Sequence, residues 1–288
     1  MQLHLISCQS LAGPIELGVR VYNPQAQQTL IAWHGFARHG GDFSGLAQHL
    51  TDWRILAPDT PGRGYSAWAP QNTQDLALYY SYANYQHLAL QLIAHYQLQE
   101  INWLGTSMGG LLGLRLAAGH LQGRMQRLIL NDIGPQIQPS GVERIIKYLS
   151  QDYLFADLET ASKVLRRIYA GFPLHHPHTW AQMLQTSVRR LPDGQWTFHY
   201  DPRIVRQFYY EPSYDLWAAW QNIAQAEIPS LIIRGAHSDI LSLETCQKMQ
   251  QIYPPADLFI CPHAGHAPLL DSLSEALSLQ AFLNDQGN

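Results

Sequence analysis

Charged residues are scarce in this sequence. Asp, Glu, Lys and Arg make up 14 % of the 288 residues, against about 25 % in an average soluble chain. Hydrophobic residues reach 46 %, so the chain lacks the low hydrophobicity and high charge of disordered proteins. The formal net charge is −4. A nucleic-acid-binding surface, which needs an excess of basic residues, is therefore not expected.

Cysteine and long apolar runs are also nearly absent. Cys8, Cys246 and Cys261 are scattered and odd in number, which favours a reduced, cytoplasmic chain over a disulfide framework. No stretch approaches the roughly 18 apolar residues of a membrane span. The start of the chain has neither the cationic segment nor the apolar core of a signal peptide. We predict no membrane span and no signal peptide.

Short apolar runs alternate with helical patterns along most of the chain. Leu3–Cys8 and Ile15–Tyr22 predict an antiparallel hairpin, whereas Leu30–Trp33 is continuously apolar, as in a strand covered on both faces. Six of the eight predicted strands follow that hairpin: Leu30–Trp33, Ile55–Ala57, Ile101–Leu104, Leu128–Leu130, Leu231–Ile233 and Leu258–Cys261. Helical patterns between them predict an α/β fold with a mostly parallel sheet and helices on both faces.

Residues 135–220 interrupt this alternation. Fifteen of the 31 Phe, Trp and Tyr residues fall there, more than a solvated linker carries. The expected helices of this segment are Val142–Leu149, Leu158–Tyr169, Thr179–Leu191 and Pro202–Tyr209. We predict a helical cap at 135–220, inserted into a core made of residues 1–134 and 221–288. Most of the aromatic rings are expected to pack between helices, and the rest to line a pocket.

Gly105-Thr106-Ser107-Met108-Gly109 lies between a predicted strand and a predicted helix. A serine on such a tight turn has a strained backbone that exposes its hydroxyl, and the flanking glycines leave room for the turn. A G-x-S-x-G pattern alone is a weak signal. Its place between strand and helix makes Ser107 a candidate nucleophile. The alternative is a serine that only caps a glycine-rich helix.

A serine nucleophile needs a base, and the base needs a group that orients it. His266, in the loop after the last predicted strand, is the expected base, and His263 of the same loop is the alternative. Asp239 follows the preceding strand and is the expected acid. Asp132, at the end of the strand after the serine turn, is its rival, because it also lies at the carboxyl edge of the sheet.

A tetrahedral oxyanion needs two fixed N–H donors. The amide of Met108 is expected to supply one, because it opens a helix whose dipole favours negative charge. The amide of Phe36, in the loop after Leu30–Trp33, is expected to supply the other. His34 is expected to shape that loop without transferring protons, and Arg63 to fix a turn.

Several short motifs together resemble the α/β-hydrolase superfamily. They are His34-Gly35-Phe36, Asp59-Thr60-Pro61-Gly62-Arg63-Gly64-Tyr65-Ser66, the Gly-Thr-Ser-Met-Gly-Gly turn, Ser238-Asp239 and Gly265-His266-Ala267-Pro268. The resemblance covers the whole chain. Within the superfamily, the chain is similar to helical-cap carboxylesterases and carbon–carbon bond hydrolases. It implies an α/β-hydrolase fold with an eight-stranded sheet, a triad of Ser107, Asp239 and His266, and oxyanion donors at Phe36 and Met108.

The expected activity is hydrolysis of small to medium apolar carboxylic esters through an acyl-enzyme, with a small-molecule ester as the partner. Two alternatives stay open: a lactone, thioester or carbon–carbon bond hydrolase with the same triad, and a binding protein that does not turn over. No cofactor or metal is expected. The histidines of His175-His176-Pro177-His178 have no cysteine or carboxylate beside them and predict a cap loop. The oligomeric state is not encoded in any pattern of the sequence.

Overall fold

The structure is a computed structural model of the whole chain, and it describes residues 1–169, 177–210 and 215–285. Its main element is an eight-stranded sheet with the strand order β1-β2-β4-β3-β5-β6-β9-β10. These strands are β1 (Gln2–Ser10), β2 (Gly13–Tyr22), β3 (Gln28–Trp33), β4 (Trp53–Pro58), β5 (Ile101–Thr106), β6 (Met125–Asn131), β9 (Ser230–Gly235) and β10 (Asp257–Cys261). All neighbours pair in parallel except β1 with β2 and β2 with β4. The predicted α/β-hydrolase sheet is therefore confirmed.

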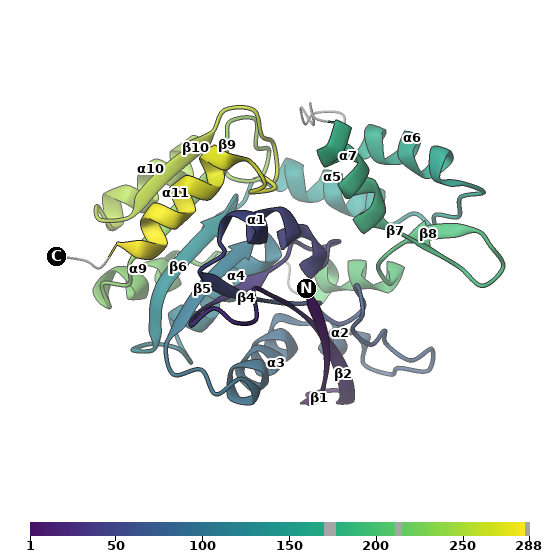
Figure 1. Cartoon of the computed structure of the whole chain (residues 1–288), viewed down its shortest axis with the longest axis horizontal. Helices are drawn as coiled ribbons and strands as arrows, with labels where there is room; N and C mark the ends of the chain where they lie inside the picture. Colours follow the sequence, from purple (N-terminus) through teal and green to yellow (C-terminus); the bar gives the residue numbers. More distant parts are fainter. Residues whose placement is uncertain (170–176, 211–214, 286–288) are drawn as a thin grey trace.

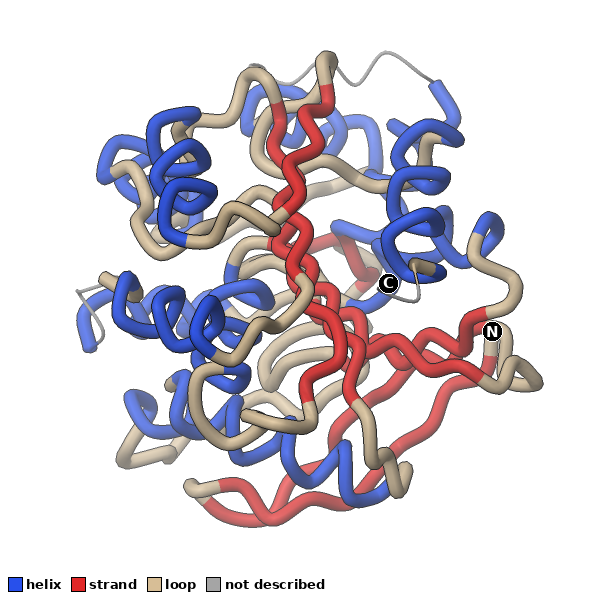
Figure 2. The backbone as a smooth tube through the Cα atoms, turned by 90° about the vertical axis from the view of Figure 1, so that its left-hand side faces the viewer, coloured by secondary structure: helices blue, strands red, loops and turns tan. Residues whose placement is uncertain are grey.

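Helices cover both faces of this sheet (Figures 1 and 2). Those of the core are α1 (Ser44–His49), α2 (Leu76–Tyr79), α3 (Tyr82–His95), α4 (Met108–Ala117), α9 (Trp217–Gln225), α10 (Leu243–Ile252) and α11 (Leu273–Asn284), with the 3₁₀ turn η1 (Gly40–Phe43). Strand β3 shows why both faces of the sheet need to be covered by helices. Leu30 and Ala32 join the core cluster under α1 and α11, whereas Ile31 and Trp33 join the cluster under α3 and α4. A strand that is apolar on both faces is stable in a water-soluble fold only if other elements cover both faces.

The segment between β6 and β9 carries further elements at one end of the sheet (Figure 1). They are α5 (Pro139–Leu149), α6 (Leu158–Ile168), α7 (Pro177–Ser187), β7 (Val188–Arg190), β8 (Trp196–Phe198), η2 (Pro202–Arg206) and α8 (Gln207–Tyr210). The expectation of an all-helical segment is wrong in one respect. The helix expected over Thr179–Leu191 ends at Ser187, and β7 pairs antiparallel with β8. Both strands have three residues, too few for a clear alternating pattern.

Candidate active site

Ser107 lies at the turn from β5 to α4 with φ 52° and ψ −113°. A positive φ is unfavourable for a residue with a side chain and is held only where the surroundings impose it. Here the Ser107 amide donates to the carbonyl of Asn131 on the neighbouring strand β6 at 3.0 Å. The predicted turn is therefore present, with Ser107 at its apex.

Glycine is required on both sides of this turn because backbone crosses close by. A Cβ on Gly105 would lie 2.2 Å from the carbonyl oxygen of Gly109. A Cβ on Gly109 would lie 2.1 Å from the carbonyl oxygen of Trp33 on β3. Since both distances are far inside van der Waals contact, the glycine spacing allows helix α4 to start against the sheet.

His266 lies in the loop between β10 and α11, and its Nε2 is 2.8 Å from Ser107 Oγ. The loop is tied to β6, because the Asn131 side-chain amide donates to the carbonyl of Pro268 at 2.9 Å. The structure thus brings together the predicted nucleophile and the predicted base, 159 residues apart in sequence. His263, the alternative base, is exposed, and His266 occupies the place beside the serine.

Asp132, not Asp239, is the carboxylate that contacts His266. Its Oδ2 lies 2.7 Å from His266 Nδ1, and the Asp132 side chain is fully buried. A carboxylate only accepts hydrogen bonds, so Nδ1 carries the proton and Nε2 of the neutral ring is left to accept from Ser107. Two further donors hold the acid: the Gly235 amide at 2.8 Å and the Ser238 hydroxyl at 2.6 Å.

The structure does not join Asp239, the expected acid, to His266 by any hydrogen bond among the described residues. Asp239 lies in the loop from β9 to α10 and accepts two hydrogen bonds from Arg144 of α5, at 2.6 Å from Nε and 3.0 Å from Nη2. Burial raises the pKa of the Asp239 carboxyl, but the hydrogen bond and charge of Arg144 outweigh it, and the net pKa lies below the usual value. Asp239 thus joins the sheet edge to the segment between β6 and β9.

Phe36 lines the same cavity as Ser107, and Met108 follows Ser107 as the first residue of α4. Among the described residues, neither backbone amide has a hydrogen-bond acceptor. The fully buried Arg63 donates from Nε to the Phe36 carbonyl at 2.8 Å, which holds the backbone that follows the Phe36 amide. Arg63 also donates to the carbonyl of Pro61 at 2.7 Å. The predicted turn-fixing role of Arg63 agrees with these contacts.

His34 shapes the same loop. One ring nitrogen lies 2.7 Å from the Gly35 carbonyl and the other accepts from the Thr60 amide at 2.8 Å. Burial lowers the pKa of His34 well below its usual value. The ring is therefore neutral, with both nitrogens engaged in structural hydrogen bonds.

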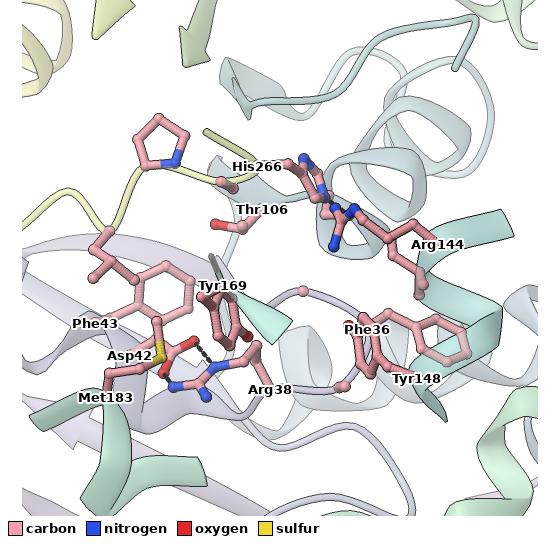
Figure 3. A pocket seen from close by; sticks show the side chains of 17 residues that line it. Phe36, Arg38, Asp42, Phe43, Thr106, Arg144, Tyr148, Tyr169, Met183 and His266 are labelled. Atoms are coloured by element: carbon pink, nitrogen blue, oxygen red, sulfur yellow. Dashed lines mark hydrogen bonds and ion pairs between the residues drawn. The ribbon is translucent and has the colours of Figure 1, made fainter. Parts of the chain in front are cut away.

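A cavity of about 80 Å³ opens above Ser107 and His266. Its wall is mostly apolar or aromatic, but Arg38, Asp42 and Arg144 also line it. Figure 3 shows the Arg38–Asp42 pair on one side and Arg144 extending from α5 toward His266. No sequence pattern predicts these charged groups, because their convergence depends on how α5 and the loop after β3 are placed.

The described residues contain neither a metal-ligand cluster nor a helix that could span a membrane. No three His, Cys, Asp or Glu side chains in that part of the chain are grouped to hold a metal ion. His175 and His176 lie outside the described residues. None of the described helices combines the length and the apolar character needed to cross a membrane.

Comparison with known proteins agrees with this fold. A family model described as "alpha/beta hydrolase fold" matches residues 28–273. A 3-hydroxybutyrate-oligomer hydrolase of Cupriavidus necator is 33 % identical, over 98 % of this chain and 97 % of its own length. A pimeloyl-[acyl-carrier protein] methyl ester esterase of Nitrosomonas europaea is 26 % identical, over 84 % of this chain and 89 % of its own length. The crystal structure of an α/β hydrolase from Novosphingobium aromaticivorans superposes with a TM-score of 0.86, at 30 % identity and 98 % coverage of both chains.

The chain belongs to the α/β-hydrolase family. Its relatives are named as hydrolases and esterases, and the chain is a hydrolase of this fold.

Proposed function

We propose that this chain is a serine hydrolase with Ser107 as nucleophile, His266 as base and Asp132 as the group that orients the base. The observation that carries the proposal is the unbroken line of contacts from Ser107 Oγ to His266 Nε2 at 2.8 Å and from His266 Nδ1 to Asp132 at 2.7 Å. Ser107 attacks the substrate carbonyl while His266 accepts its proton. The imidazolium formed is stabilised by the Asp132 carboxylate, and it then protonates the leaving alcohol. A water molecule activated by His266 releases the acid from the acyl-enzyme.

The amides of Phe36 and Met108 are proposed to bind the oxyanion of the tetrahedral intermediate. Met108 is the first residue of α4, so its N–H has no acceptor within the helix and lies at the positive end of the helix dipole. A fixed donor of this kind contributes about 10²-fold or more to the rate in acyl transfer.

The substrate class is proposed to be small to medium carboxylic esters, in particular linear oligoesters of short hydroxy acids. Two observations support this choice. The relative named for 3-hydroxybutyrate oligomers matches nearly the whole chain. The cavity also combines apolar walls with guanidinium and phenol groups, which suits a substrate that carries oxygen atoms along a short carbon chain. A lactone, thioester or carbon–carbon bond substrate remains the second candidate, because the same triad would attack any of these carbonyls.

Residues 135–220 are proposed to act as a cap over the site, since Arg144, Ile145, Tyr148, Tyr169 and Met183 contribute to the cavity wall. A cytoplasmic location is proposed from the three cysteines, all of which are buried and free, as is usual in a reducing compartment.

A fluorophosphonate probe tests the proposal, because it reacts with an activated serine. We expect rapid labelling of the native protein, no labelling of Ser107→Ala, and release of 3-hydroxybutyrate from its linear dimer only by the native protein. Labelling without hydrolysis of any ester or thioester would instead support a binding protein. Labelling that persists in Ser107→Ala would contradict the assignment of the nucleophile.

A further inference from the structure

A second, smaller cavity adjoins the one above Ser107. It measures about 20 Å³ and shares four wall residues with the catalytic cavity: Ala37, Arg38, Tyr148 and Tyr169. The remaining wall consists of Leu165, Ile168, Ser187, Phe198 and Tyr200. Because about 10–15 Å³ of such space holds one water-sized group, this cavity has room for one small group and not for a hydrocarbon chain.

The hydroxyl of Tyr200 has no hydrogen-bond partner in this wall. The residue is 6 % exposed, and its buried oxygen has no hydrogen-bond partner among the described residues. A buried polar group left unpaired is unfavourable, and such groups in native proteins call for an explanation. Burial, with the phenol of Tyr148 and its neighbours, raises the pKa of Tyr200 well above its usual value. Tyr200 is therefore a protonated hydroxyl, able to donate.

The ring that carries this hydroxyl is held in place. It stacks on Phe198 of β8 with ring centroids 5.6 Å apart. The backbone of Tyr200 also forms an antiparallel bridge with Arg63, the residue that fixes the Phe36 peptide. Arg63 thus links the backbone of Tyr200 to the loop that carries Phe36. A fixed donor loses little conformational entropy when it binds a ligand oxygen.

We propose that the Tyr200 hydroxyl is a specificity-determining donor for a substrate oxygen that lies beyond the ester being cleaved. An oligoester of short hydroxy acids carries a second ester carbonyl one repeat away from the first, whereas a plain fatty-acid ester has only methylene groups there. The small cavity accepts the oxygen and the Tyr200 O–H donates to it. This inference rests on the proposed hydrolase function and adds to it a reason for preferring oxygen-bearing acyl groups.

Two chromogenic esters of matched shape test the inference. One is p-nitrophenyl 3-acetoxybutanoate, and the other is p-nitrophenyl 3,5-dimethylhexanoate, in which carbon replaces the two oxygens of the second ester. We expect the native enzyme to prefer the acetoxy ester in kcat/KM. Tyr200→Phe removes only the hydroxyl and is expected to reduce this preference by about tenfold, the size expected when one buried hydrogen bond to substrate is lost. The rate on the all-carbon ester should be nearly unchanged.

Tyr153→Phe is the matched control. The Tyr153 ring packs against the same Phe198 ring, with centroids 4.7 Å apart, but Tyr153 lines neither cavity. Loss of the Tyr153 hydroxyl should therefore leave the preference for the acetoxy ester intact. Stability gives a second readout. Because the Tyr200 hydroxyl lacks a partner, Tyr200→Phe should unfold at the same or a higher urea concentration than the native chain, whereas loss of a structural hydrogen bond would lower that concentration.

The possible outcomes distinguish a failure of the Tyr200 inference from a failure of the proposed hydrolase function. A native enzyme that cleaves both esters with equal kcat/KM overturns the inference and leaves the hydrolase intact. The same holds if Tyr200→Phe keeps the native preference. A native enzyme that cleaves neither ester overturns the proposed function, and the inference with it.

Discussion

Two aspartates lie close enough to His266 to be considered as its partner, and they differ in what else they contact. Asp132 is fully buried and accepts from an amide, a hydroxyl and the histidine. The Asp239 side chain is about one-third exposed and accepts two hydrogen bonds from the Arg144 guanidinium. Their different surroundings give a direct test of the triad.

Asp132→Asn is expected to lower kcat by about 10⁴-fold, because an amide at this position favours the wrong tautomer of the histidine. Asp239→Asn is the matched variant, because it makes the same change after the neighbouring strand β9. It should keep kcat within about tenfold of the native value. Single-turnover kinetics on a chromogenic ester measures both. If Asp239→Asn showed the larger loss, the assignment of Asp132 would be wrong.

The sequence was enough to predict that Ser107 and His266 lie together, but not which aspartate contacts the histidine. The Gly105 and Gly109 spacing marks the serine turn, and the loop before the last helix marks His266. Asp132 and Asp239 follow the adjacent parallel strands β6 and β9, so both belong to the same sheet edge. Which one reaches the histidine depends on the turn after Gly235, where the Ser238 amide donates to the Gly235 carbonyl at 3.0 Å. That turn places the Ser238 hydroxyl on Asp132 and leaves Asp239 facing Arg144.

At the scale of elements, Arg38 joins the loop after β3 to helix α7. Its Nε donates to Asp42 of η1 at 2.8 Å and its Nη2 to Thr186 of α7 at 2.7 Å, and Ser187 also accepts from it. Burial lowers the pKa of Arg38, but Asp42 more than reverses this and the net pKa is raised. The side chains of the Arg38–Asp42 pair are only 13 % and 17 % exposed. Removing one partner would leave a poorly solvated charge.

Arg38→Met is expected to destabilise the chain by about 3 kcal/mol, because it leaves Asp42 without its counter-ion. The double variant Arg38→Met/Asp42→Leu should lose less stability than the two single variants added together, by about 1 kcal/mol or more. An interaction energy of about this size is typical of residues in contact. Urea unfolding of the four proteins gives these values. Strictly additive losses would show that Arg38 and Asp42 do not stabilise each other.

The elements of the sheet were more predictable than those between β6 and β9. Strands such as Leu30–Trp33 are continuous apolar runs, whose burial on both faces is readable from composition alone. The β7–β8 hairpin surrounds Pro192-Asp193-Gly194, a typical turn sequence, but its flanking residues include Arg189, Arg190 and Thr197 and resemble an exposed helix end as much as a strand. Their pairing is decided by tertiary contacts, such as the backbone bridge from Phe155 to Trp196.

At the scale of the whole molecule, two buried histidines, His34 and His39, and the half-buried His199 link stability to pH. Burial lowers the pKa of His34 and His39 well below the usual value of about 6.5, and lowers that of His199 to about 4. The unfolded chain therefore binds protons at these positions below pH 6.5 while the folded chain does not. Since the unfolded state binds more protons in this range, the free energy of unfolding rises with pH between about 4 and 6.5.

Each of these histidines is expected to remove up to about 1.4 kcal/mol of stability per pH unit as the pH falls below 6.5. Urea unfolding at pH 7, 6 and 5 measures the slope, and His199→Gln should reduce it. His120, which is exposed, provides the control, because His120→Gln should leave the slope unchanged. A free energy of unfolding that stays constant from pH 7 to pH 5 would contradict the argument.

The bond between Arg144 and Asp239 has one further consequence. The carboxylate bonded to His266 follows β6, so Asp239 in the loop after β9 is left to bind Arg144 of α5. Under the proposed mechanism, the loop after β9 then takes no part in proton transfer, and the segment between β6 and β9 can vary without changing the proposed triad. A chimera that exchanges the residues between β6 and β9 for those of a relative, and keeps Asp132, would inherit the donor's substrate range while retaining this chain's own nucleophile.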